Sequence, residues 1–183
     1  FVALAQKLAD MALNYESKED FLNGEIDGMT VAEKMTEQTG VIGEKIEIGT
    51  FQTLSGTFVN AYIHAGNKIG AVVALSAKAD GVEEVAREVA MQVAAMDPVA
   101  LNENEVAAEI IEKEMEIAKD QLKQEGKPEN MIENIAKGKL QKFFKDNTLV
   151  HQPFIKDSKI SVADHVKSIH PELEVKGYIR YSL

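Results

Sequence analysis

The histidines are the first residues whose type could carry chemistry, because an imidazole can bind zinc or transfer a proton. The chain contains His64, His151, His165 and His170, and no two of them lie four residues apart, the spacing that places two zinc ligands on one helix face. The chain has no cysteine, so thiolate ligands, thiolate nucleophiles and disulfides are excluded. We therefore expect no metal site and no cofactor, and we interpret these histidines as surface or hairpin-end residues.

Glycines and carboxylates offer two further kinds of chemistry. The string Gly66-Asn67-Lys68-Ile69-Gly70 lacks the Gly-Lys-Ser/Thr ending of a phosphate-binding loop and lies between two predicted strands, so we expect no direct nucleotide binding. Carboxylate clusters at 83–84, 112–116 and 129–133 have lysine or arginine three or four residues away, which favours solvated ion pairs over acid–base catalysis. No Ser-His-Asp signature stands out, and the sequence predicts a protein that is not an enzyme.

Composition narrows the class of protein. The 183 residues are 45% hydrophobic, which is enough for a core, and 30 acidic against 20 basic residues give a formal charge of −10. This charge disfavours nucleic acid as the main partner, because phosphate contacts need clustered lysine and arginine. No apolar run approaches the roughly 20 residues that cross a bilayer. We expect a soluble, cytoplasmic protein with no membrane contact, whose natural N-terminus precedes Phe1.

Three-residue and four-residue apolar spacing predicts an amphipathic helix over residues 1–13. Thr30 and Glu33 form a capping-box pair before a second helix, for which Gly43 is the expected stop. Residues 45–77 change to alternating and β-branched patterns, which predict three strands. These strands are expected at Ile46–Ile48, Thr57–Ile63 and Ile69–Leu75, with hairpin turns at Ser55-Gly56 and Ala65-Gly66-Asn67.

Helical periodicity returns at 82–96, where Asp97-Pro98 ends it. Two further apolar stripes flank Gly126-Lys127-Pro128, so we expect an antiparallel helical hairpin at about 107–146. The outer faces of these two helices are rich in Glu and Lys, which suggests an arm projecting into solvent. A short helix capped by Ser161 and a strand at 175–181 complete the pattern. The fold class is therefore α+β: small antiparallel sheets flanked by helices, with the helical hairpin inserted. We divide the core into an N-terminal part, 1–78, and a C-terminal part, 79–183.

Longer strings resemble the elongation factor Ts family over nearly the whole chain. Phe1-Val2-Ala3 is similar to the end of the family's Thr-Asp-Phe-Val-Ala motif, and Ala90–Ala95 is similar to its Ala-Met-His-Val-Ala-Ala helix. Three more strings match its sheet hairpin, the entry into its coiled-coil arm and the segment that closes the arm. These are Tyr62-Ile63-His64 with Lys68-Ile69-Gly70, Val106 to Ala118, and Gly126-Lys127-Pro128 through Gly138-Lys139-Leu140 to Gln152-Pro153-Phe154. We expect these residues to be the family's core without its N-terminal helical domain, and Gln92 stands where many members carry histidine.

The resemblance implies a guanine-nucleotide exchange factor that binds GDP-bound and nucleotide-free elongation factor Tu. In the family the motif phenylalanine inserts between helices of elongation factor Tu, while the sheet hairpin and the Met-His-Val-Ala helix press on the same domain. The implied partner-binding residues are Phe1 with Val2, Ile69 with Gly70, and Gln92.

Each of these assignments has an alternative. Phe1 could be merely the first apolar residue of a helix, Ile69 and Gly70 a strand start that needs close backbone approach, and Gln92 a surface residue of its helix. The helical hairpin could be an intramolecular pair that needs no partner, or it could dimerise at its tip. A rival function is a scaffold protein that forms a homodimer through the hairpin, and it predicts no effect on nucleotide release.

Overall fold

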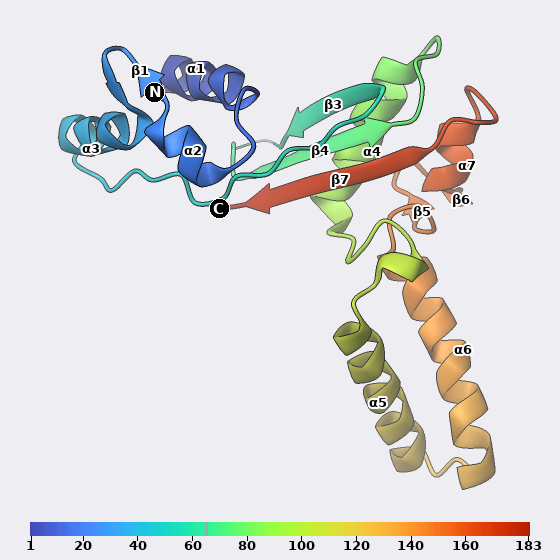
Figure 1. Ribbon diagram of the computed structural model, residues 1–183. Coiled ribbons are helices and arrows are strands. Elements are labelled where there is room, and N and C mark those ends of the chain that lie inside the picture. The colour runs from blue at the N-terminus through green and yellow to red at the C-terminus, as the bar shows by residue number, and fades with distance from the viewer. Residues whose placement is uncertain (65) are drawn as a thin grey trace. The chain divides into compact units, whose positions relative to one another are not determined.

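The computed structural model describes residues 1–64 and 66–183, and the chain divides into two compact units (Figure 1). Unit 1 comprises Phe1–Thr53 and unit 2 comprises Leu54–Leu183. Both contain helices and small antiparallel sheets, in agreement with the predicted α+β class. The proposed division of the core between residues 78 and 79 stays a prediction. Within the described ranges, no helix combines the length and apolar character needed to span a bilayer.

Unit 1 is a small helical body with a two-stranded hairpin. Its core centres on Phe21, Ile26 and Val31, and the rings of Tyr15 and Phe51 contact Phe21 edge-on and at a tilt, respectively. The predicted helices at the start of the chain and after Thr30 are confirmed, whereas a short helix and the hairpin between them were not predicted. The elements are α1 (Val2–Ala12), α2 (Lys18–Asn23), β1 (Glu25–Ile26), β2 (Met29–Thr30) and α3 (Val31–Ile42).

The predicted capping box begins α3. The Glu33 backbone N–H donates to Thr30 Oγ1 at 3.2 Å, and the Thr30 backbone N–H donates to the Glu33 carboxylate at 2.8 Å. These two hydrogen bonds satisfy amides that have no partner inside the helix. At the other end Gly43 adopts the left-handed conformation with φ of 80°, which glycine adopts without steric cost.

Thr30→Ala is expected to lower the free energy of unfolding of unit 1 by about 1 kcal/mol, because the first turn of α3 loses its side-chain acceptor. Thr30→Ser keeps that acceptor and should stay close to the parent. Urea denaturation followed by circular dichroism measures both. Equal stability of the alanine and serine variants would show that the Thr30 hydroxyl does not stabilise the helix.

Unit 2 is built on a three-stranded antiparallel sheet with the order β3-β4-β7. The strands are β3 (Phe58–Ile63), β4 (Ile69–Leu75) and β7 (Val175–Ser182). The predicted hairpin between β3 and β4 and the predicted C-terminal strand are confirmed. Of the expected turn residues, Ala65 lies outside the described residues, while Gly66 and Asn67 both have positive φ, and His64 N–H donates to Ile69 C=O at 2.8 Å.

The strand predicted at Ile46–Ile48 is wrong, and so is its predicted hairpin turn at Ser55-Gly56, because residues 45–57 form no strand. The alternating apolar residues of this segment are used in unit 1 instead. Ile48 packs on the Phe21 cluster, and the Ile46 backbone N–H donates to Thr39 Oγ1 at 3.0 Å.

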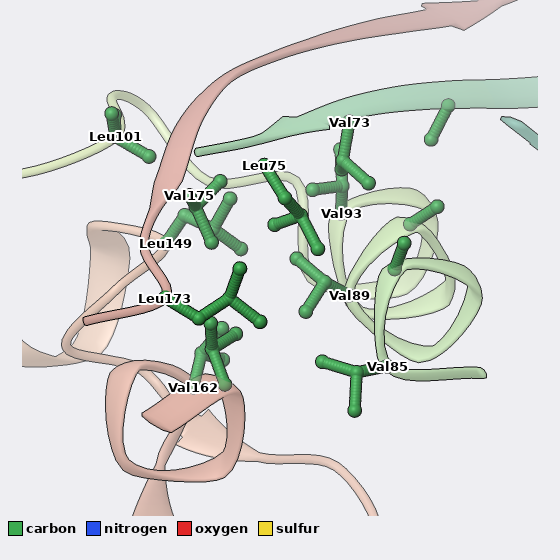
Figure 2. Packing of buried hydrophobic residues seen from close by; sticks show 14 of the residues in the cluster. Val73, Leu75, Val85, Val89, Val93, Leu101, Leu149, Val162, Leu173 and Val175 are labelled. Atoms are coloured by element: carbon green, nitrogen blue, oxygen red, sulfur yellow. The ribbon is translucent and has the colours of Figure 1, made fainter. Parts of the chain in front are cut away.

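Helix α4 (Val82–Met96) covers one face of this sheet and contributes more buried residues to the main core than any other element. Figure 2 shows Val89 of α4 near Leu75 and Val93 near Val73 of β4, and Val85 of α4 belongs to the same core. The same core is completed from three other segments by Leu149, Val162, Leu173 and Val175. Helix α4 is thus in contact both with the sheet and with the C-terminal part of the chain.

Two long helices, α5 (Ala108–Gln124) and α6 (Glu129–Asn147), lie side by side after the short 3-10 helix Glu103–Glu105 (Figure 1). Ala118 and Leu122 of α5 pack against Ile132 and Ala136 of α6. An ion pair between Lys119 and Glu133 at 2.6 Å also joins the helices. A second apolar cluster around Ala100, Val106 and Phe144 holds the other end of the pair.

The segment after α6 forms a small hairpin and a short helix. The hairpin consists of β5 (Pro153–Phe154) and β6 (Asp157–Ser161), and the helix α7 spans Val162–Lys167. Ser161 caps α7 as predicted: its hydroxyl accepts from the Asp164 backbone N–H at 3.1 Å, and the Asp164 carboxylate accepts from the Ser161 backbone N–H at 3.1 Å. Val162 and Val166 point into the main core.

Candidate partner-binding site

Phe1 and Val2 are exposed apolar residues of unit 1. Phe1 precedes α1 as its N-cap, and its carbonyl accepts a hydrogen bond from the Ala5 backbone N–H at 2.9 Å. The exposed fractions are 73% for Phe1 and 80% for Val2. The structure therefore places Phe1 at the start of the helix, as its simpler interpretation expects, but gives the ring no buried place in the core.

Helix α1 is held in unit 1 by partly buried side chains and by an ion pair between Lys7 and Asp27. It contains no buried residue, and Leu4 and Leu8 pack against the Phe21 cluster from one side. Phe1, Leu4, Leu8 and other side chains from α1, α2, α3 and the segment 46–51 line an open cavity of about 300 Å³. Phe1 thus lies at the edge of an apolar hollow, with most of its ring in solvent.

Ile69 and Gly70 begin the central strand of the unit 2 sheet. Gly70 pairs with Ile63 on β3 and with Tyr181 on β7, and Ile69 packs partly against the main core. A Cβ atom added at Gly70 would meet none of the described residues within 4 Å. The interpretation that Gly70 permits close backbone approach within the chain is therefore wrong, because open space lies in front of it.

Apolar side chains surround Gly70 on its exposed face. Its two register partners, Ile63 and Tyr181, are both exposed, whereas the exposed Val59 of β3 pairs with Ala74, four residues further along the strand. These side chains leave an apolar surface around the glycine.

Gln92 is a buried residue of α4 with an exposed fraction of 0%. Its amide Nε2 donates to Gln152 Oε1 at 3.1 Å and to the Pro153 carbonyl at 3.2 Å. Its Oε1 accepts from the Ile155 backbone N–H at 2.8 Å. The interpretation of Gln92 as a surface residue is wrong. Its proposed effect on partner binding stays a prediction, and a direct contact would require its side chain to leave this network.

A charged cluster beside Gln92 was missed in the sequence. Glu88, with an exposed fraction of 8%, accepts hydrogen bonds from Lys156 Nζ at 2.5 Å and from His165 Nε2 at 2.7 Å. The His165 ring stacks on Phe154 with a centroid separation of 3.9 Å. His165 is therefore no surface histidine. The four residues come from α4, β5, the β5–β6 turn and α7, and no spacing rule connects positions so far apart.

The electrostatics of this cluster favour an ionised Glu88. Burial raises the pKa of the Glu88 carboxyl, but the hydrogen bonds and charges of Lys156 and His165 outweigh it and hold the pKa below its ordinary value. Among the residues that the structure describes, no three potential metal ligands converge. The cluster is an ion-pair network that holds three segments together, and nothing in its geometry provides an open position for a substrate.

The structure distributes the predicted site residues over both units. Phe1 and Val2 belong to unit 1, whereas Ile69, Gly70 and Gln92 belong to unit 2, where α4 packs on β4. Comparison with known proteins identifies the family to which the chain belongs. The family model described as Elongation factor TS matches residues 1–183. The chain belongs to the elongation factor Ts family.

Similar proteins support the same assignment. The elongation factor Ts of Flavobacterium psychrophilum is 62% identical over 183 residues, covering 100% of this chain and 67% of that protein. The elongation factor Ts of Christiangramia forsetii is 60% identical with the same coverage. That of Amoebophilus asiaticus is 45% identical over 183 residues, covering 98% of this chain and 66% of that protein. The chain therefore belongs to a family of translation elongation factors that act in protein biosynthesis.

Proposed function

We propose that this chain is a guanine-nucleotide exchange factor that binds elongation factor Tu and promotes GDP release during translation elongation in the cytoplasm. The observation that carries the proposal is the exposure of Phe1 and Val2, at the position where the family motif places its inserted phenylalanine. The factor needs no catalytic residue of its own, because it changes affinity instead of making or breaking bonds.

The physical basis is a coupling between two ligands of elongation factor Tu. A bound guanine nucleotide depends on Mg²⁺ and a phosphate cradle held in register. A side chain that displaces helices at this cradle weakens nucleotide binding, and by reciprocity the nucleotide weakens binding of the factor. Each 1.4 kcal/mol or so of coupling corresponds to about a tenfold change in affinity.

Several contacts must share this coupling. Burial of one phenylalanine side chain provides roughly 1.5–3 kcal/mol, which cannot supply a large coupling alone. The start of β4 is the second proposed contact, because Gly70 faces open space among the exposed side chains of Ile63 and Tyr181. Such a surface fits another protein's backbone closely only while position 70 carries no side chain.

The direct test is release of a fluorescent GDP analogue from elongation factor Tu. The 183-residue chain is added at increasing concentration, with an equal concentration of serum albumin as the control. We expect the release rate to rise with concentration and to saturate. A release rate that stays at its spontaneous value, together with no binary complex in size-exclusion chromatography, would contradict the proposed function.

Gly70→Val is expected to weaken binding to elongation factor Tu by about tenfold or more, because its side chain fills the open space through which the partner would approach. The variant should keep the parent's fold, since a Cβ atom at position 70 meets no described atom within 4 Å and valine suits a strand. Titration calorimetry measures the affinity, and the exposed Val59→Thr serves as the matched control on β3. Unchanged affinity of a folded Gly70→Val variant would exclude this contact.

A second candidate function is a scaffold that dimerises through α5 and α6. Ile117 on α5 and Met131 on α6 are exposed and could contact another chain. Most of the apolar stripe needs no partner, because its buried residues pack against one another: Ala118, Leu122, Ile132 and Ala136. We therefore favour an intramolecular pair, which serves as the arm of the proposed factor. Light scattering after size-exclusion chromatography separates the two: a dimer that dissociates on Ile117→Ser would favour the scaffold.

A further inference from the structure

Helix α4 carries two buried polar side chains that the proposed partner contacts do not use. Glu88 and Gln92 lie one helical turn apart, and both are directed at the segment that contains β5, β6 and α7. Buried polar groups are costly unless they are hydrogen-bonded, so two of them in a row on an otherwise apolar helix face require a structural reason.

Gln92 fixes the entry into the β5–β6 hairpin. Its single side chain holds three points of that segment, namely the Gln152 side chain, the Pro153 carbonyl and the Ile155 amide. An apolar residue of equal size would fill the same volume but would leave the Ile155 N–H and the Pro153 carbonyl without these partners. The amide of Gln92 therefore determines where the hairpin backbone lies on α4.

Glu88 fixes the remainder of the same segment. Lys156 approaches from the β5–β6 turn and His165 approaches from α7, and these are the charged groups that contact the carboxylate. Phe154 of β5 stacks on the His165 ring and connects the two halves of the network. Glu88 and Gln92 together fasten both ends of the segment from Gln152 to His165, which we call the clasped segment.

Helix α4 also supports the strand that carries the proposed Gly70 contact. Val85, Val89 and Val93 pack in one core with Val73 and Leu75 of β4. The same helix therefore touches β4 through apolar residues and the clasped segment through Glu88 and Gln92. If the clasped segment moves on α4, the clasped segment also moves relative to β4, because α4 and β4 are packed together.

We propose that Glu88 and Gln92 are positioning residues for nucleotide exchange, which hold the clasped segment in the place where the folded factor engages its partner. This inference rests on the proposed exchange function. Neither side chain touches the partner, and each acts through the backbone and side chains that it holds. Loss of either one loosens the clasped segment and weakens engagement, while β4 and its Gly70 keep their structure.

The first experiment replaces Gln92 by methionine, which keeps the volume and removes the hydrogen bonds. Hydrogen exchange measured by NMR should show the Ile155 amide about tenfold or more less protected, with the Val73 amide of the sheet unchanged within about threefold. In GDP release from elongation factor Tu, the concentration for half-maximal rate should rise about tenfold, while the saturating rate stays within about twofold. Arg87→Ala, at an exposed position of the same helix, is the control.

The second experiment uses the charge of Glu88. Because its pKa is held below the ordinary value, the stability it provides is present above about pH 4.5 and is lost as the pH falls through the lower folded-state pKa. Protection of the Lys156 and His165 amides, corrected for intrinsic exchange, should fall more steeply with acid than protection of Val73. Glu88→Gln cannot titrate and should remove this difference.

The outcomes separate the inference from the proposed function. If the parent chain does not accelerate GDP release, the proposed function fails and the role in exchange fails with it. In another outcome the parent accelerates release, and Gln92→Met loses protection at the Ile155 amide but keeps the parent's half-maximal concentration. The positioning role is then wrong, while the proposed exchange function stands. If Gln92→Met does not fold, Glu88→Gln is assayed in its place. The inference is again overturned if Glu88→Gln loosens the clasped segment but reaches its half-maximal rate of GDP release at the same concentration as the parent.

Discussion

Phe1→Ala is expected to reduce the affinity of the chain for nucleotide-free elongation factor Tu, and with it the acceleration of GDP release, by roughly 10- to 100-fold. The reason is that the ring would be buried only in the complex. In the free chain Phe1 is 73% exposed and lies at the edge of an open cavity, so its removal takes away little buried surface. The loss should therefore appear in binding and exchange, while the free energy of unfolding stays within about 0.5 kcal/mol of the parent.

Stopped-flow release of a fluorescent GDP analogue measures this effect across a range of chain concentrations. Leu13→Ala is the matched control, because Leu13 is an equally exposed apolar side chain at the opposite end of α1. Phe1→Leu tests whether apolar bulk is sufficient or the ring is required. If Phe1→Ala and Leu13→Ala both behave like the parent, Phe1 is only the first apolar residue before α1.

The local elements could be predicted because their signals are local. The capping boxes at Thr30 and Ser161, the stop at Gly43 and the apolar periodicity of α4 act over a few residues, and the structure has each of them. The β1–β2 hairpin could also have been found, since Asp27 and Gly28 both have positive φ and an Asp-Gly pair favours this kind of turn.

The missed features depend on which distant segments meet. Residues 46–48 alternate like a strand, but alternation does not tell whether the apolar side chains will join a sheet or, like Ile48, a helical cluster. Burial of Gln92 follows from the position of residues 152–155, which are about sixty positions away in the chain. The same holds for Glu88 and His165, whose contact spans 77 positions.

For the candidate site too, the sequence could predict which residues matter but not where their side chains lie. The identities of Phe1, Ile69 and Gly70 came from matched strings, and the structure adds that Phe1 is exposed and that open space faces Gly70. Whether a matched position presents its side chain outwards cannot be known from a string, and for Gln92 the structure places the side chain inside. A residue can thus belong to a functional motif because it positions others, which is the role proposed for Gln92.

Leu75→Ala is expected to lower the free energy of unfolding of unit 2 by about 2–5 kcal/mol. Leu75 is 0% exposed at the end of β4, where it packs with Val89 of α4 and Leu173 before β7 (Figure 2). Removing its terminal carbons leaves a cavity between segments that approach from several directions, and a sheet covered by a helix cannot collapse freely to fill it.

Urea denaturation followed by circular dichroism measures this loss. Val59→Ala is the control, because Val59 lies on neighbouring β3 with its side chain exposed, and it should change stability by no more than about 0.5 kcal/mol. The clasped segment should loosen in Leu75→Ala as well, because Val162 and Leu173 share the same core. A loss below about 1 kcal/mol would mean that the sheet, α4 and α7 can close around a missing side chain, and that the main core does not fix α4 as tightly as its role between β4 and the clasped segment requires.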